Sequence, residues 1–341
     1  MKNKINLGII GKNFGYHVIY KSFLKNKNFK ILGFSFKSKK TNKLKIPKNV
    51  KIYFNWRKLI LNKKINAIVI ATPPSLNAKI IKFAIKHNKH IFCEKPFTCS
   101  IKEANYVCKL IEKKNISHMV NYEFVEIDAF RFFKNRILKR KLKINKIDLD
   151  WFVNVRRKSK NSWKEDYATG GGIMFNFVCH AIYYLELLFG KISAIKLNIS
   201  LEKKKKVKTL YGTIFFHNNI SAQINVKVGS INKKIKPVHE LKIESYKKIY
   251  ILKTKLDSLS DKFELIEMKK NPKGNDYKTL YKNNRDKKDF RIKPTFQNSK
   301  KFSNWILKGN KQTPNFFNAK RIHKIIDKML ISSKEKRKIY I

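Results

Sequence analysis

The segment His90-Ile91-Phe92-Cys93-Glu94-Lys95-Pro96 is a short apolar run that ends in a glutamate, a lysine and a proline. Such a run is typical of a strand in a parallel sheet. In open parallel α/β sheets, ligands bind in the crevice outside the carboxyl ends of the strands. A lysine ammonium in that crevice can stabilise a developing alkoxide, and proline stiffens the chain after it. We therefore expect Lys95 to lie where a cofactor meets a substrate.

Strands and helices alternate on both sides of this segment, as far as residue 121. Ile5–Ile10, Phe29–Phe34 and Ala67–Ala71 are further apolar runs of strand length. Ser75 is expected to cap a helix that extends to about His87. This alternation predicts an α/β fold whose N-terminal part is a doubly wound parallel sheet.

After Tyr122 the pattern changes to consecutive strand-like runs joined by short polar turns. This order predicts an α+β domain with an open, mostly antiparallel sheet. The expected strands are Ile147–Val155, Ile192–Leu201, Val207–Phe216, Ile220–Val228 and Leu241–Leu252; the expected helices are Ala129–Lys139, Ile173–Phe189, Phe302–Leu307 and Phe316–Ile331. Residues 256–295 are polar and lysine-rich and resist assignment.

The composition is strongly basic, with 79 lysines and arginines against 23 acidic residues and a net charge of +56. Such a charge suggests a nucleic-acid partner. However, the lysines are spread over almost every segment, and Asn, Ile and Phe are also abundant, which a genome-wide base bias explains. We therefore expect no specific nucleic-acid partner. No segment approaches a membrane span, no cysteine or histidine spacing indicates a metal site, and we expect a cytoplasmic protein.

The turn Gly11-Lys12-Asn13-Phe14-Gly15 is the candidate phosphate cradle. Glycine lets the backbone approach a pyrophosphate, and the following helix N-terminus offers unpaired N–H groups. The turn is one residue shorter than the G-x-G-x-x-G fingerprint, and Asn13 replaces the middle glycine. Asparagine tolerates a left-handed backbone conformation better than other non-glycine residues. A tight strand–helix turn without a ligand is the alternative interpretation.

The end of the second strand has Ser35 and Lys37 where a dinucleotide site usually places an acidic residue for the ribose 2′-hydroxyl. Hydroxyl and ammonium groups suit a 2′-phosphate, which favours NADP(H) slightly over NAD(H). The alternative is that the lysines of this region, Lys37 to Lys40, only follow the general composition.

Asn176 and His180 are four residues apart on an expected helix that is otherwise strongly apolar, so both side chains share one face. A lone histidine on such a helix is often a core residue. A neutral imidazole can also accept a hydroxyl proton while hydride leaves the same carbon. Trp163 and Tyr167, just upstream, can offer a stacking surface for a sugar, or they pack in the core.

Taken together, these motifs resemble those of the glucose-fructose oxidoreductase / inositol dehydrogenase family (Gfo/Idh/MocA). The resemblance rests on Ala71-Thr72-Pro73-Pro74, on Cys93-Glu94-Lys95-Pro96, and on Gly170-Gly171-Gly172 followed by Asn176 and His180. The ending, from Phe302 to Ile341, is also similar. The resemblance implies a Rossmann dinucleotide-binding domain over residues 1–122. It implies a substrate-binding and oligomerisation domain over 123–341, whose C-terminal helices can pack back on the first domain.

The resemblance further implies NAD(P)-dependent hydride transfer at a secondary alcohol of a sugar, cyclitol or nucleotide-linked sugar, by a homodimer or homotetramer. It places Lys95 against nicotinamide and the substrate hydroxyl, with His180 as acid/base. The remaining expected site residues are Gly11, Asn13, Phe14, Gly15, Ser35, Lys37, Thr72, Pro73 and Glu94 for the cofactor, and Asn176, Trp163 and Tyr122 for the substrate.

One position departs from the family pattern, because members usually carry aspartate where this chain has Asn176. Asparagine can orient a hydroxyl but cannot accept a proton. Two alternatives therefore stay open: a catalytically inactive NAD(P)-binding regulator of the same fold, and a cofactor-assisted glycosidase.

Overall fold

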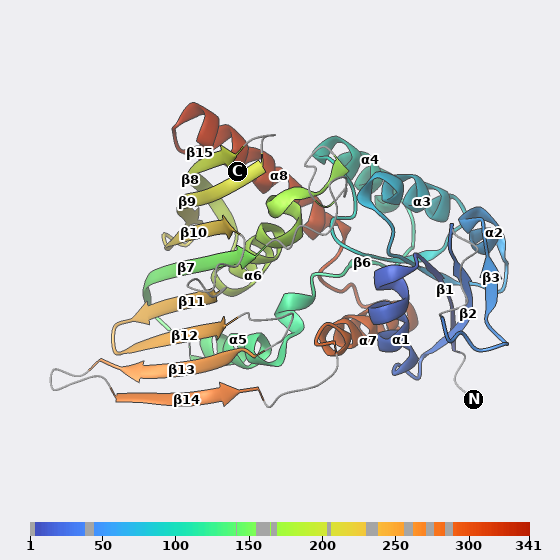
Figure 1. The fold of residues 1–341 in the computed structure, drawn as a ribbon, viewed down its shortest axis with the longest axis horizontal. Helices are drawn as coiled ribbons and strands as arrows, with labels where there is room; N and C mark the ends of the chain where they lie inside the picture. Colours follow the sequence, from blue (N-terminus) through green and yellow to red (C-terminus); the bar gives the residue numbers. More distant parts are fainter. Residues whose placement is uncertain are drawn as a thin grey trace. The chain divides into compact units, whose positions relative to one another are not determined.

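The computed structural model describes residues 4–37, 44–140, 142–154, 164, 169–202, 206–229, 238–255, 262–270, 276–283 and 289–341 (Figure 1). The chain forms two compact units, and both draw on distant parts of the sequence. The first unit comprises Met1–Glu123, Asp166–Gly171 and Arg291–His323; the second comprises Phe124–Glu165, Gly172–Phe290 and Lys324–Ile341.

The first unit is built on a six-stranded parallel sheet with the order β3-β2-β1-β4-β5-β6. Its strands are β1 (Ile5–Ile10), β2 (Phe29–Ser35), β3 (Lys51–Tyr53), β4 (Ala67–Ile70), β5 (His90–Cys93) and β6 (His118–Val120). All four residues of β4 are buried, as a strand covered on both faces requires. The predicted doubly wound parallel sheet is confirmed.

Helices cover both faces of this sheet (Figure 1). Helices α2 (Trp56–Leu61), α3 (Pro74–Lys86) and α4 (Ile101–Glu112) lie on one face; η1 (Gly15–Tyr20), α1 (Lys21–Leu24) and α7 (Ile292–Lys308) lie on the other. The predicted cap at Ser75 is wrong, because α3 already begins at Pro74 with Pro73 in the cap position. Proline suits the first helical turn, where its φ is already helical and its missing N–H needs no partner.

The second unit is built on a nine-stranded mixed sheet with the order β14-β13-β12-β11-β7-β10-β9-β8-β15. Among the described strands of this second sheet, only β7 and β10 pair in parallel. The strands are β7 (Ile144–Asn154), β8 (Ile192–Glu202), β9 (Lys206–Phe216), β10 (Ser221–Gly229), β11 (Val238–Ser245), β12 (Lys248–Lys255), β13 (Glu264–Lys269), β14 (Asp276–Lys282) and β15 (Ile339–Tyr340). The run Leu241–Leu252, predicted as one strand, is a hairpin of two.

One face of this sheet packs against helices, and the other is polar. The helices of the second unit are η2 (Glu123–Glu126), α5 (Asp128–Arg140), η5 (Met174–Val178), α6 (Cys179–Phe189) and the last part of α8 (Phe316–Glu335). Leu149 and Trp151 of β7 are buried, whereas Asp148 and Asp150 lie on the polar face. Within the described ranges, no helix is long and apolar enough to cross a membrane.

Candidate functional site

Five segments of the first unit that the sequence singles out follow the carboxyl ends of neighbouring parallel strands. Gly11 follows β1, Ser35 ends β2, Thr72 follows β4, Glu94 follows β5, and Tyr122 follows β6. The strand order reverses between β1 and β4, which lie side by side at the centre of the sheet. This is the topological switch point at which doubly wound sheets bind nucleotides.

Gly11 occupies a position that only glycine can fill. Its φ is +125°, and an added Cβ would collide with the carbonyl group of Ala71. Its own N–H donates to the Ser35 carbonyl oxygen at 3.0 Å. The absence of a side chain therefore lets the turn after β1 lie against the backbone of the β4 loop, at the place where the sequence predicts a phosphate cradle.

The rest of the turn leads directly into a helix. Asn13 is exposed and Phe14 is half-buried. The centroid of the Phe14 ring lies 5.1 Å from the guanidinium carbon of Arg291. Arg291 directly precedes α7. Residues Gly15–Tyr20 form a π-helix, a conformation frequent at functional sites.

The end of β2 contains the residues that the sequence predicts to distinguish the two dinucleotides. Ser35 is buried, and Lys37 is exposed. Residues 38–43, with the other lysines of the predicted 2′-phosphate site, lie outside the described part of the chain.

Three sequence motifs meet around the Glu94-Lys95-Pro96 segment. Lys95 is half-buried and Pro96 is buried, and the peptide bond between them is cis. Gly170, with a φ of +78°, packs so tightly that an added Cβ would lie 2.8 Å from Cβ of Pro74 and 3.4 Å from Cγ of Pro96. The triple glycine therefore lets a segment from residue 170 contact both proline turns.

Glu94 is a buried carboxyl group in a polar network. Its Oε1 accepts a hydrogen bond of 2.6 Å from Nδ2 of Asn121. Burial, and next the charge of Glu123, raise the pKa of Glu94 to about 8. The Asn121 hydrogen bond and the positive charges of Lys95 and Arg291 act in the opposite direction. Burial and the neighbouring charge of Glu123 thus favour the protonated form of this carboxyl group.

Glu94→Gln should flatten part of the pH dependence of stability. Between the ordinary pKa of 4.5 and about 8, the folded chain holds a proton that the unfolded chain has lost. The free energy of unfolding therefore falls as pH rises through this window, by at most about 1.4 kcal/mol per pH unit. Urea unfolding from pH 5 to pH 9 should show this fall in the wild type relative to Glu94→Gln. Glu112→Gln, at an exposed position, controls for the lost charge; equal curves for all three proteins would refute the assignment.

Tyr122, an expected substrate contact, is almost fully buried, and its N–H donates to the carbonyl oxygen of Val120 at 2.9 Å. It directly follows Asn121, which holds the Glu94 carboxyl group. The structure thus places Tyr122 in the loop after β6, next to the network of the Lys95 segment.

The second unit contains Asn176 and His180. Asn176 lies in the π-helix η5, and His180 follows in α6. Nδ2 of Asn176 donates to the Lys164 carbonyl oxygen at 2.7 Å, a bond that an aspartate could not make. The His180 ring is 2% exposed and stacks on Phe124, with ring centroids 4.3 Å apart. Trp163 and Tyr167 lie outside the described residues.

A second histidine in this unit lacks any sequence signature. His239 of β11 is fully buried, and its Nε2 lies 3.0 Å from the Tyr184 hydroxyl group. Its ring lies edge-on to Trp151 with centroids 4.5 Å apart. Burial lowers the pKa of His239 to about 3, so this ring stays neutral. His239 is thus a core residue of the sheet, and it contacts the helix α6 that also contains His180.

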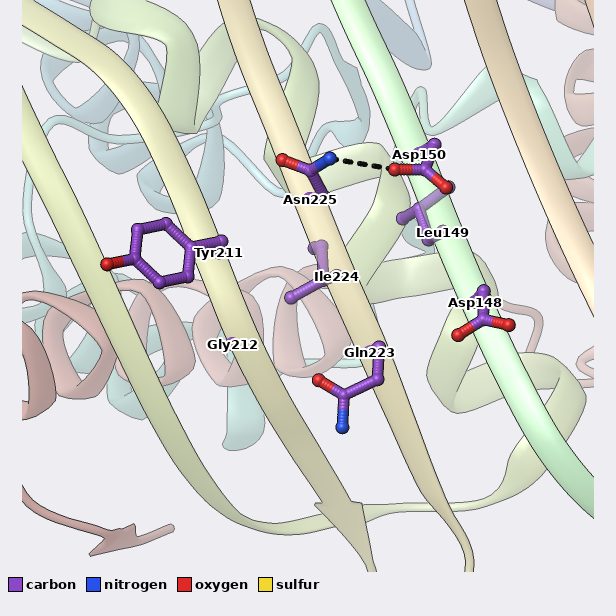
Figure 2. A pocket seen from close by; sticks show the side chains of 8 residues that line it. All are labelled: Asp148, Leu149, Asp150, Tyr211, Gly212, Gln223, Ile224 and Asn225. Carbon is purple, nitrogen blue, oxygen red and sulfur yellow. Dashed lines mark hydrogen bonds between the residues drawn. The ribbon is translucent and has the colours of Figure 1, made fainter.

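A hollow of about 260 Å³ lies on the polar face of the second sheet, over β7, β9 and β10 (Figure 2). Asp148, Asp150, Tyr211 and Asn225 line it, and Nδ2 of Asn225 donates to Oδ1 of Asp150 at 2.8 Å (Figure 2). His180 belongs to the helical layer on the other face, so the hollow is separate from the predicted acid/base.

Models of known families match both parts of the chain. The model for an oxidoreductase family with an NAD-binding Rossmann fold matches residues 5–122, and the model for its C-terminal α/β domain matches residues 134–261. The Gly11 cradle at the switch point fits the dinucleotide that this fold binds.

Among curated relatives, an uncharacterised oxidoreductase of Synechocystis sp. is 28% identical over 44% of this chain and 41% of its own length. Levoglucosan dehydrogenase of Pseudarthrobacter phenanthrenivorans is 30% identical over 43% of this chain and 38% of its own length. The aligned part spans about half the length of such relatives, or less. A solved structure of levoglucosan dehydrogenase in complex with NADH and levoglucosan superposes with a TM-score of 0.84 at 17% identity, over 99% of this chain and 100% of the other.

The two family models follow one another along the chain in the order of the two folds described above. Both belong to the same family, and together they extend from residue 5 to residue 261. This chain therefore belongs to the Gfo/Idh/MocA family of oxidoreductases with an NAD-binding Rossmann fold.

Proposed function

We propose that this protein is an NAD(P)-dependent oxidoreductase that transfers a hydride between nicotinamide and a secondary alcohol or ketone of a sugar, cyclitol or nucleotide-linked sugar. The proposal rests on one observation: Lys95 follows β5, and the Gly11 turn follows β1, at the same edge of the sheet as the switch point between β1 and β4. Relatives named levoglucosan dehydrogenase and D-xylose dehydrogenase support the substrate class.

In this account the first unit holds the dinucleotide, which supplies a hydride acceptor or donor when bound. The turn from Gly11 to Gly15, with Asn13 and Phe14, receives the phosphates. Ser35 and Lys37 contact the adenosine ribose. Thr72, Pro73 and Glu94 line the remainder of the cofactor site.

The chain's own groups then act on the substrate hydroxyl. The Lys95 ammonium stabilises the negative charge that develops on the alcohol oxygen. The His180 imidazole accepts the hydroxyl proton during oxidation and returns it during reduction. Asn176, Trp163 and Tyr122 would orient neighbouring hydroxyl groups, which fixes the carbon that reacts.

A turnover screen tests this proposal. Purified protein with NAD⁺ or NADP⁺ is mixed with monosaccharides, anhydrosugars and cyclitols, and reduced nicotinamide is followed by absorbance. We expect turnover with at least one polyol. Saturable cofactor binding without turnover on any compound would contradict the enzyme assignment.

We further propose that NADP(H) is slightly preferred over NAD(H), because Lys37 is an exposed cation at the end of β2. Lys37→Ala should weaken NADPH binding about tenfold, or ~1.4 kcal/mol, and leave NADH binding unchanged. Fluorescence titration at low and moderate salt measures both affinities. Lys30→Ala, exposed at the other end of the same strand, is the matched control. An equal loss of affinity for NADPH and NADH would show that Lys37 confers no preference for NADP(H).

A second candidate function is a nucleotide-sensing binding protein. Asn176 supports it, because its amide donates to a backbone carbonyl and no carboxylate stands at this position. This candidate predicts cofactor binding without turnover in the screen. A cofactor-assisted glycosidase would instead release an aglycone without net change in reduced nicotinamide.

We also propose that the protein is cytoplasmic and that it assembles as a homodimer or homotetramer. The polar face of the second sheet supports the assembly, because Asp150 and Tyr211 on that face are exposed. Light scattering coupled to size-exclusion chromatography gives the mass of the assembly, and a monomer at all concentrations would refute it.

A further inference from the structure

Two buried asparagines lie on either side of Lys95 in the first unit. Asn77 is 1% exposed and comes from α3; Asn121 is fully buried and follows β6. Each forms a hydrogen bond with one of the two residues that flank Lys95 in the sequence. Neither residue belongs to a motif, and neither is among the expected contacts of the cofactor or the substrate.

Asn77 ties the loop after β4 to the loop after β5. Its Nδ2 donates to the Pro96 carbonyl oxygen at 3.1 Å, and its Oδ1 accepts from the Thr72 hydroxyl group at 2.6 Å. One side chain thus fixes the backbone immediately after Lys95 relative to the threonine of the neighbouring turn.

Asn121 fixes the residue before Lys95. Its Nδ2 donates to Oε1 of Glu94 at 2.6 Å and to the Thr295 hydroxyl oxygen at 3.1 Å. Its Oδ1 accepts from Nδ2 of Asn298 at 2.9 Å. Thr295 and Asn298 come from α7, so a helix far along the sequence sets the orientation of this amide.

The energetics of burial make this arrangement specific. A buried amide without partners is costly, and the nitrogen and oxygen of both the Asn77 and the Asn121 amide have hydrogen-bond partners, so one orientation of each side chain is strongly favoured. At position 77 an aspartate cannot donate to the Pro96 carbonyl oxygen. At position 121 an aspartate would replace the N–H donor to Glu94 by a second carboxyl group, beside a glutamate that already faces Glu123.

We propose that Asn77 and Asn121 are positioning residues that hold the Pro96 carbonyl group and the Glu94 carboxyl group, and with them the Lys95 ammonium, at the place where it meets the substrate oxygen. The inference rests on the proposed function for the role of Lys95, but the geometry of this clamp is independent of it. A displacement of about 1 Å at a reacting group can cost about 100-fold in rate.

The test compares Asn77→Asp and Asn121→Asp with Asn26→Asp. Asn26 is a matched control because it is also buried in the first unit and also donates to α7, to the Ser299 hydroxyl oxygen at 3.1 Å, but it does not contact the Lys95 segment. With a substrate from the screen, both clamp variants should lower kcat about tenfold to 100-fold. KM and the Kd for NADH should change less than threefold, and the control should keep kcat.

A second readout needs no substrate. Each protein, without cofactor, is treated with a trace of an amine-reactive anhydride, and peptide mass spectrometry gives the labelling rate of Lys95 relative to exposed Lys79 of α3. We expect a change of at least threefold in this ratio in both clamp variants and none in Asn26→Asp. Because this readout does not require turnover, it decides on the clamp even if no alcohol is oxidised.

Thr295→Val provides a second test in case the aspartate variants do not fold. It removes one hydroxyl partner of Asn121 and keeps the shape of the side chain. It should change the Lys95 labelling ratio in the same direction by a smaller factor. Thermal unfolding identifies any variant that is not folded. Labelling ratios and kcat values in folded clamp variants that equal those of Asn26→Asp would overturn the proposal.

Discussion

Gly11→Ala should lower the affinity for reduced nicotinamide dinucleotides at least about 100-fold, or ~2.7 kcal/mol. The new Cβ would meet the carbonyl group of Ala71, a backbone atom that cannot rotate away. The backbone at position 11, with a φ of +125°, also disfavours any residue with a Cβ by about 1–3 kcal/mol. Since β1 and the β4 loop would have to separate, the cradle would lose its shape. Fluorescence titration with NADH and NADPH measures the loss.

Gly309→Ala is the matched control for this prediction. Its φ is also positive, at +72°, but an added Cβ would meet no atom within 4 Å. Gly309 follows the carboxyl end of α7 and is not an expected contact of the dinucleotide, so we expect this variant to bind the dinucleotide within about threefold of the wild type. Equal affinities for Gly11→Ala and the wild type would show that the turn is a structural feature without a ligand.

Lys95→Met and His180→Gln should nearly abolish turnover while dinucleotide binding survives. Loss of the Lys95 ammonium should lower kcat about 100-fold to 1,000-fold, because the alkoxide charge loses its stabilising partner. Loss of the His180 imidazole should lower it by about 100-fold to 10,000-fold, because glutamine cannot accept the hydroxyl proton. Steady-state kinetics with a substrate from the screen gives both values.

Lys79→Met, at an exposed position on α3, controls for the removal of one positive charge from a strongly basic chain. Turnover at the wild-type rate in either Lys95→Met or His180→Gln would show that the assigned roles are wrong.

The architecture of the first unit could be predicted because its strands leave a strong signature. Continuous apolar runs such as Ile5–Ile10 and Ala67–Ile70 are buried on both faces, and their ends carry the recognisable turns. Strand β3 and helix α2 were not predicted, because three and six residues of mixed polarity are too short to show a hydrophobic periodicity. In the second unit the hairpin between β11 and β12 was hidden, because Leu241–Leu252 is apolar on both sides of an unremarkable turn.

The clamp around Lys95 could not be predicted for a different reason. The sequence does not distinguish a buried asparagine from an exposed one. In addition, the partners of Asn121 on α7 are more than 170 residues away along the chain. Likewise, nothing in the sequence indicates that Arg291 lies against Phe14, or that Gly170 packs on Pro74 and Pro96. Such contacts depend on tertiary packing, whereas the turns that expose Gly11 and Lys95 are local.

Deuterium transfer tests the proposed hydride transfer most directly. The protein is incubated with NAD⁺ or NADP⁺ and a mixture of monosaccharides, anhydrosugars and cyclitols that carry deuterium on every carbon. Mass spectrometry of the recovered cofactor then detects the transferred atom. We predict reduced dinucleotide that contains one added deuterium, formed at least about 100-fold more slowly when Lys95→Met replaces the wild type. Cofactor that binds saturably but is recovered unreduced and unlabelled would contradict the account and favour the binding-protein alternative.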